Sequence, residues 1–364
     1  MNKITYIFSG GRINKSNNKA YAEEFFYGYK YLSKEHPHVS IIEFNNIASF
    51  LKKIEHKLSK AFSLPLYIFS ILSKKTIKSI KETDHLILVS ESAGFASLLP
   101  LILYKRKYKI KTYMFVMGMY SKKINFKIFK VFHNAIISLL VRYLDKLYFL
   151  GNEEFQIAKS RINNHEKLVF KPFHIDCDFW SSKEILPTEN NQILFIGNDG
   201  NRDFNLLNNI VKLMPDKKFI FVSSNEQLLD LQFTNVTVIK GSWKDGAMSD
   251  LDLKKIYQTS RLVMLPLKNS TQPSGQSVAL QSMSIGIPVL ITKTKGFWDK
   301  ENFIENENVF FESTSDPNRW VEKINYLFDN KELLNKVSVN ASKLVREKYS
   351  IKEFNKYLEE ELGL

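Results

Sequence analysis

Cysteine is nearly absent from this sequence, and its scarcity limits what the protein can be. Cys177 is the only cysteine among 364 residues, so no disulfide can form within the chain and a thiolate-based metal site would lack ligands. Low-complexity tracts and fixed-period repeats are also absent, which argues against a disordered or solenoid protein. A globular protein of a reducing, cytoplasmic compartment is expected.

Long apolar runs are also lacking. The first residues, 1–11, contain too short an apolar stretch for a secretion signal but suit a first β-strand. The longest apolar-rich segment, residues 61–72, contains Pro65 and several serines and is too short to span a bilayer. We therefore expect neither export nor a transmembrane helix.

Acidic residues are scarce in one part of the chain. Residues 1–180 carry 29 Lys and Arg against 14 Asp and Glu, whereas residues 181–364 carry 23 against 24. No acidic residue lies between Glu91 and Asp145, where there are ten basic ones. The net charge of +14 is thus concentrated in the first half, which predicts a basic face there.

Strand-like and helix-like segments alternate along both halves, which predicts two α/β domains with doubly wound parallel sheets. The best interdomain linker lies in the stretch from Lys171 to Asn191, which contains Pro172 and Pro187. Because ligands of such sheets bind at the carboxyl ends of the strands, the site is expected in loops that follow strands. The predicted organisation is a first domain at 1–172, a linker at 173–191, a second domain at 192–345 and a C-terminal helix at 346–364.

A loop of small and hydroxyl residues precedes a predicted helix in the second half. It contains Ser274, Gly275, Gln276 and Ser277, after which helical spacing of apolar residues begins. A glycine beside hydroxyl groups lets the backbone approach a phosphate, and a helix N-terminus adds N–H donors and partial positive charge. The segment predicts an anion site, with an ordinary serine-rich N-cap on a packing helix as the alternative.

The continuation of this segment, with Gly286 and Pro288, resembles the signature of GT-B glycosyltransferases, particularly the retaining GT4 family. The resemblance covers most of the second half and the strand-and-loop order of the first. It implies two Rossmann-like domains facing each other across a cleft, with C-terminal helices crossing back to the first domain. It also implies transfer of a sugar from a nucleotide-sugar, UDP being the commonest carrier among the relatives.

This sequence departs from the family at three positions. Pro273 and Gln281 stand where the family has its pair of glutamates, and Met117 replaces a histidine that often points at the donor sugar. The resemblance assigns Gln281 a ribose hydroxyl, since an amide both donates and accepts hydrogen bonds. Gln276 is expected to take over part of the contact of the first glutamate, and a thioether at Met117 cannot act as a general base.

Further donor contacts are implied in the second half. Gly197 and Asn198 follow its first strand, and Arg202 stands roughly where the family places a diphosphate-binding lysine. Arg202 is therefore a candidate to stabilise the leaving diphosphate, with a salt bridge to Asp203 as the alternative. Trp243 follows the strand that borders the nucleobase in the family, and it is a candidate for base stacking or an ordinary structural tryptophan.

Two places in the first half are candidates for contacts with the substrates. Gly10 and Gly11 follow the first strand and resemble the glycine-rich loop of these enzymes, although a plain tight turn explains them equally well. Glu91 lies alone at a strand end and is the leading candidate to touch the acceptor hydroxyl. The alternative is an acidic residue that complements the dipole of the following helix.

No metal site and no cofactor are predicted. The seven histidines are scattered, and Asp-x-Asp occurs only at residues 176–178 and 250–252. The nucleotide-sugar is a substrate, and in the retaining family the leaving phosphate itself can help to deprotonate the acceptor. Metal-independent transfer by orientation and charge stabilisation is therefore expected.

Two predicted helices of the first half are amphipathic and basic. Their apolar faces include Leu51 to Phe62 and Ile124 to Leu139, with lysines around them. Such helices suit an anionic membrane surface and a lipid or lipid-linked acceptor, unless they simply pack on the sheet with solvated lysines. No nucleic-acid module is recognised, so nucleic acid is not an expected partner. The remaining alternative is a catalytically inactive protein that binds sugar nucleotides or glycans.

Overall fold

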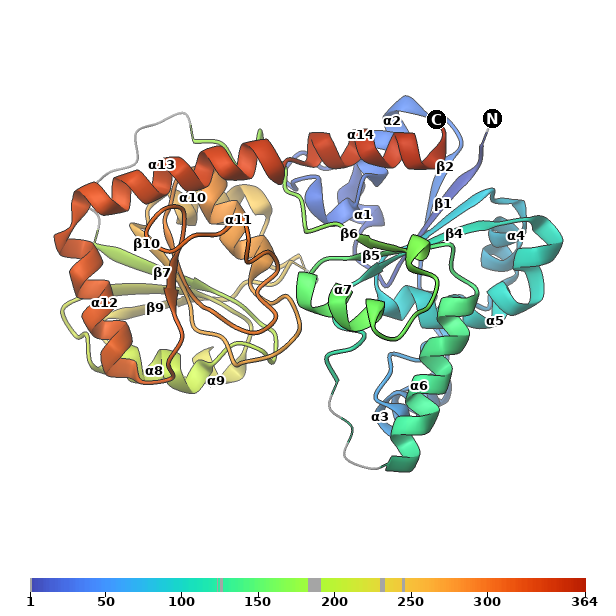
Figure 1. The fold of residues 1–364 in the computed structure, drawn as a ribbon, viewed down its shortest axis with the longest axis horizontal. Helices are drawn as coiled ribbons and strands as arrows, with labels where there is room; N and C mark the ends of the chain where they lie inside the picture. The colour runs from blue at the N-terminus through green and yellow to red at the C-terminus, as the bar shows by residue number, and fades with distance from the viewer. Residues whose placement is uncertain (1, 123, 125–126, 183–190, 230–232, 244–245) are drawn as a thin grey trace. The chain divides into compact units, whose positions relative to one another are not determined.

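The chain folds into two compact units (Figure 1). The computed structural model describes residues 2–122, 124, 127–182, 191–229, 233–243 and 246–364. Unit 1 contains Met1–Asn17, Phe26–Pro172 and Asn355–Leu364, and unit 2 contains Asn18–Phe25 and Phe173–Phe354. Within the predicted linker, residues 183–190 lie outside the described residues.

Unit 1 is built on a six-stranded parallel sheet of order β2-β1-β3-β4-β5-β6. Both β1 and β3 are fully buried, as expected for a sheet covered on its two faces. Its strands are β1 (Ile4–Phe8), β2 (Val39–Glu43), β3 (His85–Leu88), β4 (Lys111–Val116), β5 (Lys146–Phe149) and β6 (Leu168–Phe170). Its helices are α1 (Ile13–Ser16), α2 (Tyr29–Glu35), α3 (Ser49–Phe62), α4 (Lys74–Glu82), α5 (Glu91–Tyr108), α6 (Lys127–Arg142) and α7 (Asn152–Lys159), with 3₁₀ turns η2 (Phe69–Ile71) and η3 (His165–Lys167).

Unit 2 contains a second six-stranded parallel sheet, of order β12-β11-β10-β7-β8-β9. In this unit, α8 and α9 lie on one side of the sheet, and α10 and α11 lie on the other (Figure 1). Its strands are β7 (Gln192–Ile196), β8 (Lys218–Val222), β9 (Val236–Ile239), β10 (Leu262–Leu265), β11 (Val289–Thr292) and β12 (Phe310–Glu312). Its helices are α8 (Phe204–Lys212), α9 (Glu226–Leu229), α10 (Asp250–Gln258), α11 (Gln276–Ile285), α12 (Pro317–Asp329) and α13 (Lys331–Lys348); α14 (Ile351–Leu362) and the turn η1 (Glu24–Phe26) each have residues in both units.

Local sequence signals explain where the helices near the site begin and end. The Asp203 side chain caps α8 by accepting a hydrogen bond from the backbone N–H of Leu206, 3.0 Å away. Helix α11 lies between two left-handed glycines, Gly275 with φ of 79° and Gly286 with φ of 97°. A chiral side chain would be strained at either position, so these glycines fix both ends of α11.

The direction of the connections reverses once in each sheet. In unit 1 the reversal lies between β1 and β3, and in unit 2 between β7 and β10. Ligands of open α/β sheets bind in the crevice outside the carboxyl ends of the two strands at such a point. The predicted pair of doubly wound sheets is confirmed, and each sheet has one topologically favoured site. Among the described residues, no helix is long and apolar enough to span a bilayer.

Candidate active site

A small pocket lies at the switch point of unit 2. Its volume is about 190 Å³, and it is lined by residues from the loops after β7 and β9 and from α10 and α11. Five residues predicted from the sequence meet there: Gly197, Asn198, Trp243, Ser277 and Gln281. The other predicted donor residues of this unit lie outside the lining of the pocket: Arg202 in the loop after β7, Ser274 and Gly275 in the loop that precedes α11, and Gln276 at the start of α11.

The N-terminus of α11 presents backbone N–H groups that have no acceptor within the helix. The first intrahelical acceptor is the carbonyl of Gly275, which accepts from the N–H of Ala279 at 2.9 Å. The N–H groups of the first turn therefore point out of the helix, and no side chain of the N-cap residue covers them. This arrangement provides partial positive charge where the sequence predicts a phosphate.

The loop before α11 is held by Asn201 from the loop after β7. The Nδ2 atom of Asn201 donates to Ser274 Oγ at 2.8 Å and to Gln272 Oε1 at 3.0 Å. The backbone N–H of Lys268 donates to the carbonyl of Asn201 at 2.8 Å. Because Ser274 Oγ accepts from Asn201, its own proton is directed to another acceptor, such as a phosphate oxygen.

Arg202 is buried beside the same loop, with 4% of its surface exposed. Its Nε donates to the carbonyl of Ile196 at 3.3 Å, and its Nη1 lies 3.1 Å from Asp199 Oδ2 without hydrogen-bond geometry. Burial lowers the pKa of Arg202, and the nearby Asp199 carboxylate opposes that shift. The expected alternative partner, Asp203, instead caps α8. Arg202 is therefore a buried cation whose Nη1 lacks a hydrogen-bond acceptor among the described residues.

Gly197 is required by the position of Arg202. A β-carbon at residue 197 would overlap with the Nε, Cδ and Cγ atoms of Arg202. At Gly200, in the same loop, an added β-carbon would meet only open space. Gly197, predicted as a donor contact, thus makes room for the side chain of Arg202.

Gln281 is buried and bonded within the protein. Its Nε2 donates to Glu24 Oε1 at 2.9 Å, and its Oε1 accepts from the hydroxyl of Tyr257 at 3.1 Å. Glu24 Oε1 also accepts from Trp180 Nε1 at 2.7 Å. The ribose contact of Gln281 stays a prediction, but the amide group already has two protein partners.

Sequence reasoning missed Glu24. Its carboxylate accepts a hydrogen bond from Gln281 of α11, which stands at one of the two positions where the family has a glutamate. Burial raises the pKa of Glu24 to about 8, the negative charge of Asp250 adds to the shift, and the hydrogen bond from Gln281 opposes it. Glu24 lies 257 residues from Gln281 along the chain. No local signal could have paired them.

Trp243 lies at the edge of the pocket with its indole held from two sides. Its Nε1 donates to Asp250 Oδ2 at 3.2 Å, and its ring lies 5.0 Å from Phe25 and 6.0 Å from Tyr21 between centroids. The side chain is only partly buried and lines the pocket. It therefore has both structural contacts and an exposed ring surface on which a base can stack.

Unit 1 carries the remaining predicted residues at its own switch point. Gly10 and Gly11 follow β1 with φ of 148° and 76°, and the carbonyl of Gly10 accepts from Arg12 Nη1 at 2.8 Å. Glu91 begins α5 just after β3, and the preceding Ser90 has φ of 105°. A non-glycine residue with a positive φ of this size has a strained backbone, and such strain is common at functional sites.

The Glu91 carboxylate holds the loop after β4. Its Oε1 accepts from the backbone N–H of Met117 at 2.5 Å. Burial raises the pKa of Glu91, and the hydrogen bonds from Met117 and Gly118 oppose that shift. Contact with an acceptor hydroxyl stays a prediction, and the observed role of Glu91 is to position this loop.

Glu154 is a second buried carboxyl that sequence reasoning missed. Its Oε1 accepts from the backbone N–H of Tyr120 at 2.7 Å, and its Oε2 has no hydrogen-bond partner among the described residues. Burial raises its pKa to about 8, and the charge of nearby Glu91 adds to the shift. Glu91 and Glu154 thus bind N–H groups of the same loop, and burial favours a proton on Glu154 at neutral pH.

Metal ligands are not grouped in the part of the chain that the structure describes. There, no three His, Cys, Asp or Glu side chains lie close enough to hold an ion together. The two Asp-x-Asp sequences serve other contacts: Asp176 accepts from the N–H of Phe179, and Asp250 accepts from the N–H of Ala22.

Comparison with known proteins extends these observations. The family model described as "Glycosyl transferases group 1" matches residues 179–344. Among curated proteins, none matches the chain significantly in sequence.

Solved structures resemble the chain over nearly its whole length. Anabaena Alr3699/HepE, solved in complex with UDP-glucose, is 13% identical with a TM-score of 0.71, covering 99% of both chains. Sucrose-phosphate synthase from Thermosynechococcus elongatus is 12% identical with a TM-score of 0.70, covering 99% of this chain and 98% of the other. A glycosyltransferase from Rickettsia africae is 14% identical with a TM-score of 0.62, covering 99% and 97%. The chain therefore has the GT-B fold, as predicted, and its second half matches the group 1 glycosyltransferases.

Proposed function

We propose that this protein transfers a sugar from a nucleotide-sugar, preferably a UDP-sugar, to a hydroxyl group of an acceptor. The observation that carries the proposal is the N-terminus of α11, which lies with Gly197 and Asn198 around the switch point of a unit that matches group 1 glycosyltransferases. Similarity to a protein solved with UDP-glucose supports the choice of donor.

Charge stabilisation is the main chemical demand of this reaction, because a diphosphate leaves with its negative charge. The first-turn N–H groups of α11, the Ser274 hydroxyl and the Arg202 guanidinium are the groups proposed to bind it. These donors favour transfer without a metal ion, so we expect chelation by EDTA to leave the rate unchanged. Retention of anomeric configuration is proposed from the resemblance to the retaining family, and NMR of the product would check it.

The acceptor is proposed to be a lipid, a lipid-linked sugar or a cell-envelope glycan at the cytoplasmic membrane surface. Support comes from unit 1, where ten basic and no acidic residues lie between Glu91 and Asp145. Several large apolar side chains of α5 and α6 are also exposed, including Leu103 at 55% and Phe132 at 52%. Such a surface suits anionic lipid headgroups.

The test begins with donor binding, followed by turnover. Thermal unfolding with UDP, UDP-sugars and GDP-sugars should give a rise in melting temperature for the true carrier, since a ligand at 100 times its Kd adds about 2.7 kcal/mol of stability. Release of UDP in the presence of membrane lipids would then establish transfer. If no nucleotide shifts the melting temperature, the proposal is wrong.

One alternative has a specific observation in its favour. Gln281 and Glu91, two residues assigned to substrates, are already hydrogen-bonded within the protein. An inactive protein that binds sugar nucleotides or glycans would need neither group for chemistry. Donor binding without hydrolysis or transfer to any acceptor would support this alternative over the enzyme.

A further inference from the structure

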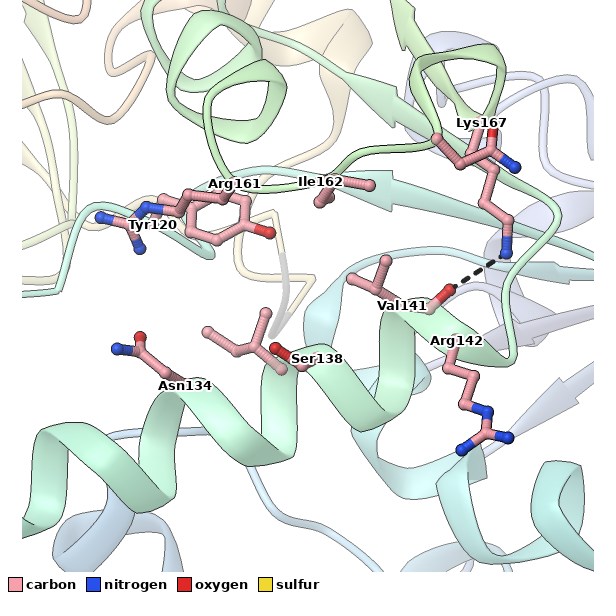
Figure 2. Close-up of a pocket in the computed structure, with 10 residues that line it drawn as sticks. Tyr120, Asn134, Ser138, Val141, Arg142, Arg161, Ile162 and Lys167 are labelled. Atoms are coloured by element: carbon pink, nitrogen blue, oxygen red, sulfur yellow. Dashed lines mark hydrogen bonds between the residues drawn. The ribbon is translucent and has the colours of Figure 1, made fainter.

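A larger pocket lies in unit 1, along one side of α6 (Figure 2). Its volume is about 510 Å³, and it is bounded by α6, by Tyr120 and by the residues that follow α7. Neither the proposed donor-binding residues nor Glu91 lines it. The proposed transfer reaction therefore leaves this pocket without a role.

The polar part of the pocket is cationic. Arg142, Arg161 and Lys167 line it, and no acidic residue does so in the described part of the chain. In Figure 2, Arg161 and Tyr120 lie at one end, and Arg142 and Lys167 lie at the other. An anion is the ligand that such a lining attracts.

The two arginines remain available for a ligand. Within the described residues, no carboxylate lies within ion-pair distance of Arg142 or Arg161. The Arg161 guanidinium lies 5.0 Å from the centroid of the Tyr120 ring, which positions it. Lys167, in contrast, donates to the carbonyls of Leu144 at 2.6 Å and Val141 at 3.4 Å, near the C-terminal end of α6.

The rest of the pocket is apolar. Ile137 and Val141 of α6 are 3% and 8% exposed, and Ile162 opposite them is partly buried. Ser138 lies between the two ends, as Figure 2 shows. A cation at the end of an apolar wall suits a molecule that is charged at one end and apolar at the other.

The neighbouring face of α6 exposes large apolar side chains to solvent. Ile128, Val131, Phe132 and Leu139 are 65%, 66%, 52% and 38% exposed, and their spacing places them on one face of the helix. The Phe132 ring lies 6.3 Å from that of Phe62 in α3, so the two helices meet at this surface. Exposed apolar groups beside cations suit contact with the boundary of an anionic bilayer.

We propose that this pocket binds the phosphate-bearing headgroup of an anionic membrane lipid while the apolar face of α6 enters the edge of the hydrocarbon layer. Arg161 binds the phosphate, Arg142 adds positive charge at the other end of the pocket, and the apolar wall accommodates the start of the lipid chain. The inference deepens the proposed membrane location and rests on it. A free phosphate ester would share the headgroup chemistry but would gain nothing from the apolar face.

The experiment is co-sedimentation of the full chain with vesicles of phosphatidylcholine alone or mixed with phosphatidylglycerol. Arg161→Gln should weaken binding to the anionic vesicles about fivefold, because one cation near a charged membrane contributes about 1 kcal/mol. Ser138→Trp fills the pocket without changing charge and should weaken binding by a similar factor. Lys78→Gln, in α4 with 77% of its side chain exposed, removes the same charge elsewhere and should bind like the wild type.

Three outcomes would overturn the proposal. Both pocket variants bind anionic vesicles as the wild type does, all three variants lose binding equally, or vesicles of phosphatidylcholine alone bind the chain as tightly as the anionic ones. The melting temperature of each variant, measured with and without UDP, separates misfolding from loss of lipid binding. Because the UDP response does not use this pocket, failure of the donor proposal and failure of the lipid proposal are distinguishable.

Discussion

Arg202 and Gly197 form the most closely fitted pair of residues near the donor pocket. The sequence predicted both as donor contacts, but it did not predict that they touch each other. That contact depends on how a buried arginine folds back over the preceding strand end, where its Nε bonds to the carbonyl of Ile196. Residue type and spacing along the chain suggest the charge, whereas only the folded loop determines where the charge lies.

Gly197→Ala should therefore impair donor use by displacing Arg202. Loss of one charge-stabilising donor typically lowers catalytic efficiency by about 10²-fold, and we expect a decrease of this order in kcat/KM. Gly200→Ala is the matched control, because its β-carbon would meet open space in the same loop. Equal kinetics for the two variants would show that the position of Arg202 does not matter to transfer.

Glu24 gives unit 2 a specific dependence on pH. Its pKa is raised from 4.5 to about 8 by burial and by Asp250, so the folded chain keeps a proton that the unfolded chain releases within this range. The free energy of unfolding should therefore fall as pH rises from about 5 to about 8, by at most about 1.4 kcal/mol per pH unit. Glu154 has a raised pKa for the same reason and contributes a decrease of the same sign.

Glu24→Gln should reduce that decrease in stability. A neutral glutamine oxygen can still accept from Trp180 and Gln281, so the hydrogen bonds are kept while the charge is removed. Melting temperatures of the variant and the wild type should differ more near pH 8 than near pH 5. An unchanged slope in the variant, with the exposed Glu332→Gln as control, would contradict the raised pKa.

Helix α11 and the loop before it were largely predictable as elements. A Gly and hydroxyl groups before apolar residues at helical spacing identified the start of the helix, and Gly286 followed by Pro288 identified its end. The contacts that hold the loop were not predictable, since they come from Asn201 and from Gly296. The N–H of Gly296 donates to the carbonyl of Ser270 at 2.7 Å, and a β-carbon there would overlap with the backbone of Thr271.

Gly296→Ala should move this loop without touching the proposed ligand contacts. Because backbone cannot yield as a flexible side chain does, the loop must shift, and Ser274 would shift with it. We expect KM for the donor to rise about tenfold with a smaller change in kcat, the pattern of lost ground-state binding. Initial rates over a range of donor concentrations would measure this, and an unchanged KM would show that the loop does not position the donor.

At the scale of the whole molecule, alternation of strands and helices was enough to predict two doubly wound sheets. Burial of every residue in β1, β3, β10 and β11 explains this success, because strands covered on both faces appear as apolar runs. Membership of each unit was harder to predict. Residues Asn18–Phe25 pack with unit 2 through Glu24 and through bonds to Asp250 and Leu251, which are distant in sequence.

The unequal charge of the two halves predicts salt-sensitive membrane binding. The first 180 residues carry 29 basic against 14 acidic residues, and many of these lysines are exposed to solvent. Raising the ionic strength from about 0.1 M to about 1 M shortens the Debye length from about 10 Å to about 3 Å, so attraction to anionic vesicles should fall steeply. Co-sedimentation across a salt series would measure this decrease. If binding does not change with ionic strength, the attraction comes from apolar contacts and not from charge.

The division of the chain between the two units also affects how the protein is made. Unit 1 includes Asn355–Leu364, and its Glu359 accepts from the hydroxyl of Tyr31 at 3.0 Å. A ribosome that has synthesised the first 172 residues has therefore not yet supplied everything this unit contains. Domains usually fold as they emerge, but here the N-terminal unit is complete only after residues 355–364 have also been synthesised.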